Sequence, residues 1–129
     1  MDKEKRMIDI ESSLNTFSPI KTNRKFLVHT NHILGKNLRH LQKEKLIESE
    51  KRYNYAVKIL GENENNITVD LLKGILRDHK SGICSHPTKK YPNQSLTIAS
   101  AIIDITNKKL FLADGNPCKA EYAEYQISF

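Results

Sequence analysis

The pattern that most restricts the fold of this chain lies in its last third. Residues 96–105 alternate with a period of two side chains, and shorter alternating stretches follow at residues 110–113 and 122–129. The connections are short, with polar residues at 106–109 and turn-forming residues at 114–117. Alternating stretches joined by short turns are typical of antiparallel strands. The last third is therefore predicted to form a three-stranded antiparallel meander.

The middle of the chain has helical periodicity. Residues 38–60 favour a helix, with Ser49 as a possible N-cap inside that span and Gly61 as the residue that closes it. A second helix is predicted after Thr68, whose hydroxyl suits an N-cap, with Asp70 in the first turn. The two helices are expected to form a pair that lies on a sheet.

The first part of the chain contains two stretches with strand character. Residues 7–10 alternate and precede a polar turn, and residues 25–32 are rich in β-forming side chains. The predicted order of elements is β-β-α-α-β-β-β, which indicates an α+β fold rather than a wound parallel sheet. No linker is apparent, so residues 1–129 are predicted to belong to one domain.

The composition and charge limit the possible partners. The chain has 129 residues, 38% of them hydrophobic, and a net charge of +6. Its basic residues are mixed with acidic ones, which is typical of a solvated helix face, so no nucleic-acid partner is expected. No apolar stretch has the length of a membrane span and no secretory signal is recognised, which predicts a cytoplasmic protein without a membrane partner.

The densest group of polar side chains is His29-Thr-Asn-His32. If this stretch is a strand, His29 and Asn31 lie on one face, and the Asn31 amide could donate a hydrogen bond to a developing oxyanion. The alternative is a strand end whose polar residues lead into a loop. On the residues alone, both interpretations remain open.

A metal site is a weaker hypothesis. The spacing of the candidate ligands matches no zinc pattern, because the chain lacks CxxC and HExxH sequences. Cys84 follows apolar Ile83 and Cys118 follows Pro117, so both thiols are predicted to be structural. No metal and no cofactor are expected. The candidate ligands are His29, His32, His79, Cys84 and His86.

Several short segments together resemble the C-terminal half of the penicillin acyltransferase family of N-terminal-nucleophile (Ntn) hydrolases. This family is named for acyl-CoA:6-aminopenicillanic acid acyltransferase. The segments occur in the family's order and spacing and cover nearly the whole chain. They are residues 27–34, 75–79, 83–87, 96–104 and 115–118 with Tyr122.

The resemblance implies an αββα sandwich and an enzyme that cleaves linear amides or transfers acyl groups. The nucleophile of such an enzyme is an N-terminal cysteine freed by autoproteolysis, and its own α-amino group is the general base. Asn31 matches the oxyanion-hole residue. The substrate of the complete enzyme would be a small-molecule amide or an acyl-CoA.

Neither Cys84 nor Cys118 matches the nucleophile. Residues 1–129 are therefore expected to be the C-terminal portion of one Ntn-hydrolase domain, inactive alone, which binds the missing N-terminal half or associates with itself. The alternative function is a non-catalytic binding module, in which the basic helix between Lys43 and Lys58 binds an acidic partner.

Overall fold

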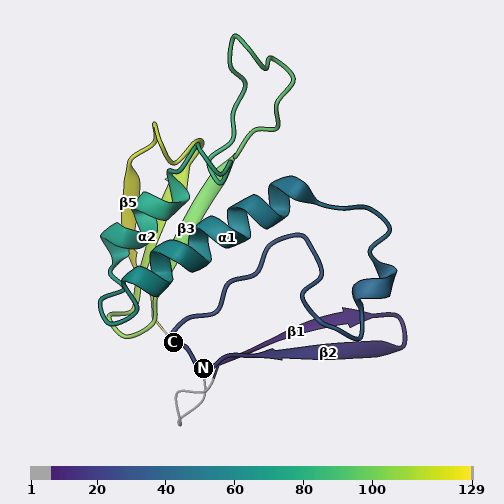
Figure 1. Cartoon of the computed structure of the whole chain (residues 1–129). Coiled ribbons are helices and arrows are strands. Elements are labelled where there is room, and N and C mark those ends of the chain that lie inside the picture. The colour runs from purple at the N-terminus through teal and green to yellow at the C-terminus, as the bar shows by residue number, and fades with distance from the viewer. Residues whose placement is uncertain (1–6, 129) are drawn as a thin grey trace. The chain divides into compact units, whose positions relative to one another are not determined.

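A computed structural model describes residues 7–128. The chain divides into two compact units, of which the first ends at Asn66 and the second begins at Ile67. Two antiparallel sheets and two α-helices make up these units, which confirms the predicted α+β class (Figure 1). Within the described residues, neither helix combines the length and the apolar character that a membrane span requires.

The first unit begins with a β-hairpin. Strands β1 (Ile8–Ser13) and β2 (Thr16–Lys21) pair antiparallel around a turn at Leu14 and Asn15. The first of these strands was predicted from the sequence, but with its end at Ile10 instead of Ser13. The second strand was not predicted. Because Pro19 lies within β2, the sequence pattern did not indicate a strand there. Both strands of a two-stranded sheet are edge strands, where proline is tolerated.

The strand predicted at residues 25–32 is wrong. The chain is irregular from Thr22 to Leu34, and side chains distant in sequence accept hydrogen bonds from the backbone N–H groups at its end. His32 N donates to Ser49 Oγ at 2.9 Å, and Ile33 N donates to Gln42 Oε1 at 2.7 Å. At the end of the segment, these side chains take the place of a strand partner and fix the path of the backbone.

Helix α1 (Ile47–Glu62) follows a short 3-10 helix, η1 (Arg39–Leu41). The predicted continuous helix over residues 38–60 is therefore wrong at its start, and the predicted caps are wrong as well. Leu46 precedes the first turn and Asn63 follows the last, so Gly61 lies inside the helix. Ser49 lies in the first turn, where its hydroxyl accepts the hydrogen bond from His32.

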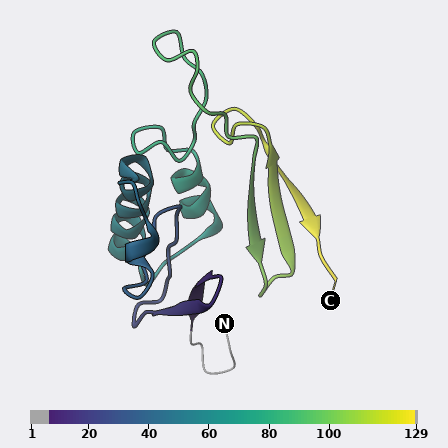
Figure 2. The same cartoon turned by 90° about the vertical axis from the view of Figure 1, so that its right-hand side faces the viewer.

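The second unit begins with helix α2 (Val69–Leu76). As predicted, Thr68 is its N-cap: Thr68 Oγ1 accepts a hydrogen bond from Leu71 N at 3.2 Å, and Asp70 lies in the first turn. The predicted meander is also confirmed, with strand order β3-β4-β5 (Figure 2). Its strands are β3 (Ala99–Asp104), β4 (Lys109–Asp114) and β5 (Tyr122–Gln126).

The two faces of this three-stranded sheet differ. One face carries buried Ile102 and Phe111 and contacts α2, whose Lys73 Nζ lies 4.9 Å from the centre of the Phe111 ring. The register places apolar side chains on the other face, where Ile103 is 62% exposed and Tyr125 is 50% exposed. We call it the open sheet face. Its apolar residues are Ala99, Ala101, Ile103, Leu110, Leu112, Ala123 and Tyr125, and Asp114 lies at its end, opposite Ala99.

Candidate active site

Asn31 lies in the irregular segment of the first unit, with its side chain exposed. Arg52 Nη2, from the second turn of α1, donates a hydrogen bond to Asn31 Oδ1 at 2.5 Å. A guanidinium can only donate, so this contact identifies the oxygen of the amide and directs Asn31 Nδ2 away from Arg52. Asn31 thus presents an N–H donor whose orientation is fixed by a charged partner.

Two pockets meet at Asn31. The first has a volume of about 360 Å³, and Asn31 shares its wall with His29 and with residues of β1 and η1. The second has a volume of about 510 Å³, and its wall also contains Lys45 and Arg52. His29 and Asn31 therefore line the same pocket, but the prediction that they share one face of a strand is wrong, because the segment is irregular.

Glu11 holds the segment that carries Asn31. Its side chain is 10% exposed, and its Oε1 accepts hydrogen bonds from His29 Nε2 at 2.8 Å and from Leu34 N at 2.7 Å. Glu11 Oε2 accepts another from Gly35 N at 2.6 Å. Burial by itself raises the pKa of this carboxyl, but the N–H groups of Leu34 and Gly35 and the His29 ring together lower it below 4.5.

The lowered pKa of Glu11 predicts that the protein loses stability at low pH. A carboxyl whose pKa is lower in the folded state stabilises the protein above the pKa of the unfolded chain, about 4.5, and loses that effect as pH falls through the folded pKa. Glu11→Gln cannot accept all three hydrogen bonds. We expect it to cost about 1–3 kcal/mol of unfolding free energy at pH 7.

Urea unfolding at pH 7 and at pH 3.5 checks this. The difference between Glu11→Gln and the wild type should shrink at the lower pH. Glu48→Gln is the control, because Glu48 is exposed in α1 and pairs with Lys51; it should have little effect at either pH. A Glu11→Gln cost that is unchanged at low pH would contradict this account of Glu11.

The other histidine of this segment has a structural role. His32 is buried, its Nδ1 lies 3.0 Å from Ser49 Oγ, and its ring stands edge-on to Tyr53. His29 and His32 both belong to the first unit. The remaining candidate metal ligands, His79, Cys84 and His86, lie together in the second unit.

Asn31 was a candidate from the sequence, but the two residues that position its neighbourhood were not. Arg52 lies 21 residues after Asn31, in a run of mixed charges that predicts only a solvated helix face. Glu11 lies 23 residues before Leu34, in a stretch that was predicted to be a turn. Neither residue belongs to a local motif, so no pattern could have indicated its role.

The comparison with known families identifies the chain. The acyl-coenzyme A:6-aminopenicillanic acid acyl-transferase family matches residues 1–119, which span both units. The chain belongs to this family, as the resemblance predicted. No curated protein and no solved structure matches the chain.

Proposed function

We propose that this chain is part of a cysteine Ntn hydrolase that cleaves linear amide C–N bonds or transfers the acyl group to an acceptor. Asn31 would be its oxyanion donor. The observation that carries the proposal is the Asn31 amide itself: Arg52 fixes its oxygen, so its N–H donor faces away from Arg52 at the meeting point of two pockets. Membership of the acyltransferase family supports the same chemistry.

The proposed reaction has two steps. The α-amino group of an N-terminal cysteine takes the proton of the thiol, and the sulfur attacks the amide carbon. Asn31 Nδ2 donates a hydrogen bond to the oxyanion of the tetrahedral intermediate. The C–N bond then breaks and the amine leaves with the proton from the α-ammonium group. Water or an acceptor amine attacks the thioester, takes the acyl group and restores the thiol.

The nucleophile would come from other sequence of the family domain. The chain contains two cysteines, Cys84 and Cys118, and neither is at an N-terminus. Burial raises the pKa of the Cys84 thiol, which disfavours the reactive thiolate. We propose that autoproteolysis of a precursor exposes the nucleophilic cysteine, and that this chain is inactive without it. Both cysteines are free thiols, which is consistent with a cytoplasmic location.

The open sheet face supports a completed αββα sandwich. One face of the meander packs against α2, and the other exposes Ile103 and Tyr125. An apolar sheet face needs a second layer to exclude water. In our proposal, a sheet from the N-terminal portion of the family domain covers it.

The alternative function as a binding module has less support. It requires the basic residues between Lys43 and Lys58 to be available to an acidic partner, and α1 contains only those from Lys51 onward. Lys51 pairs with Glu48 at 2.7 Å, and Lys58 lies 4.0 Å from Glu62. These pairs within the helix reduce the positive field that such a partner would meet.

Covalent trapping of the nucleophile tests the proposal. The chain is expressed from its intact genomic region, so that sequence encoded beside it is made with it, and the purified protein is treated with an alkyl β-lactone. A β-lactone acylates a reactive thiol and adds its whole mass. Intact-mass spectrometry should find the adduct on an N-terminal cysteine of a polypeptide that copurifies with this chain. An unlabelled preparation, or label on Cys84 or Cys118, would contradict the proposal.

A further inference from the structure

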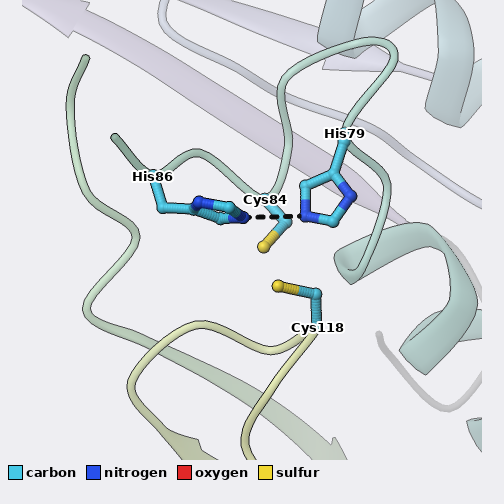
Figure 3. Close-up of side chains that lie close together, drawn as sticks. All are labelled: His79, Cys84, His86 and Cys118. Carbon is cyan, nitrogen blue, oxygen red and sulfur yellow. Dashed lines mark hydrogen bonds between the residues drawn. The ribbon is translucent and has the colours of Figure 1, made fainter. Parts of the chain in front are cut away.

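Four side chains of the second unit converge on one point. The two imidazoles and two thiols offer ligand atoms that all lie within 4.8 Å of one another, and they face a common centre (Figure 3). They come from separate segments: one histidine follows α2, two ligands lie in the next loop, and one cysteine lies between β4 and β5. The residues are His79, Cys84, His86 and Cys118.

We propose that this cluster binds a zinc ion in a tetrahedral structural site. Two imidazole nitrogens and two thiolates are a donor set that suits Zn²⁺. All four ligands come from the protein, which leaves no open position for a substrate and indicates a structural rather than a catalytic site.

The two histidines already have the geometry that a metal requires. Their Nε2 atoms lie 3.2 Å apart, and their rings are perpendicular. Two nitrogens bound to zinc at about 2.0–2.1 Å with a tetrahedral angle lie about 3.3 Å apart, so the observed separation fits. His86 Nδ1 lies 3.3 Å from the carbonyl of Pro87, to which it can donate its proton. That hydrogen bond leaves the lone pair on Nε2, as in most metal-binding histidines.

The backbone around the ligands is fixed by hydrogen bonds between the same segments. Arg77 Nε donates to the carbonyl of Pro117 at 2.9 Å, which ties the end of α2 to the residue before Cys118. Asn116 Nδ2 donates to the carbonyl of Ser85 at 3.2 Å, between the two loop ligands. The fold therefore brings the ligands together before any ion binds, which lowers the entropic cost of binding.

The charges and protons of the proposed zinc-binding step balance. The two thiols lose their protons to solvent, and the proton on His79 moves to Nδ1, so that four lone pairs face the ion. Cys84 is 2% exposed, and the cation would compensate a thiolate that burial otherwise disfavours. The ion would link the loop after α2 to the β4–β5 connection. This proposal replaces the expectation, based on sequence spacing, that no metal binds.

Cobalt substitution tests the site. The full chain is prepared with a reductant, stripped with a chelator and titrated with Co²⁺ alone. We expect one Co²⁺ per chain, with the thiolate-to-cobalt charge-transfer band and the strong visible absorption of tetrahedral cobalt. Zn²⁺ should displace the cobalt, remove the colour and raise the melting temperature.

The variants His79→Gln and Cys118→Ser leave buried Cys84 in place. Each should weaken binding by at least about 100-fold, because even outer-shell partners contribute 10–100-fold. His40→Gln, at an exposed histidine in η1, is the control and should bind normally. Binding below one equivalent without a thiolate band, or binding that His79→Gln and Cys118→Ser leave unchanged, would overturn the proposal. So would reduced protein that binds no metal and joins Cys84 to Cys118 when the reductant is removed.

Discussion

Replacing Ile103 with arginine is expected to weaken the association of this chain strongly. Ile103 lies on β3 in the open sheet face and is 62% exposed. We expect the isolated wild-type chain to associate through this face and to sediment as a species larger than the 14.8 kDa monomer. A guanidinium in that contact would have to be buried without a partner. The association constant should fall by at least about 100-fold, which corresponds to about 2.7 kcal/mol.

Sedimentation velocity and binding of a dye specific for apolar surface measure this effect. Thr106→Arg is the matched control, because it adds the same charge in the exposed turn of the same hairpin, outside the open sheet face. It should associate like the wild type. When the chain is expressed from its intact genomic region, Ile103→Arg should also reduce copurification of the nucleophile-bearing polypeptide. A compact wild-type monomer that binds no dye would contradict the proposed second layer.

The parts of the fold that sequence predicted correctly depend on local rules. The meander follows from period-two alternation with short connections, and its three strands form where that alternation occurs. The start of α2 follows from the hydroxyl of Thr68, which caps the helix three residues before Leu71. In both cases, the residues that determine the structure are neighbours in the sequence.

The incorrect predictions fall where distant side chains decide the structure. Residues 25–32 have strand composition, but Ser49 and Gln42 occupy N–H groups at the end of this stretch and just after it. Ser49 was predicted to cap a helix, yet its hydroxyl binds His32. A local pattern cannot predict these hydrogen bonds because their partners meet only after the chain has folded.

The two sites show the same limit. Asn31 could be proposed as a candidate from its local cluster and from the family resemblance, but its contact with Arg52 could not be predicted. Three members of the His/Cys cluster, His79, Cys84 and His86, were named as candidate ligands, but Cys118 was not, because it lies far along the chain and the spacing matches no zinc pattern. The β4–β5 connection brings Cys118 to them.

Replacing Asn31 should reduce turnover by the complete enzyme more than any other change in this chain. Loss of one oxyanion donor typically lowers kcat by about 10²–10³-fold. Asn31→Ala should show a loss of this size with little change in KM, because the hydrogen bond forms in the transition state. Arg52→Gln should lower kcat less, since Asn31 would keep its donor but lose its fixed orientation. Asn54→Ala, at an exposed asparagine of α1, should be unaffected.

The kcat of Asn31→Asp for amine release from an N-acyl amide tests the central claim most directly. Aspartate has the same shape and can still accept the hydrogen bond from Arg52, so it preserves any structural role of Asn31. It cannot donate to an oxyanion, and its charge would repel one. We expect Asn31→Asp to lose at least as much kcat as Asn31→Ala, with wild-type stability. An Asn31→Asp enzyme with near wild-type kcat would show that Asn31 only anchors Arg52 and is not the oxyanion donor.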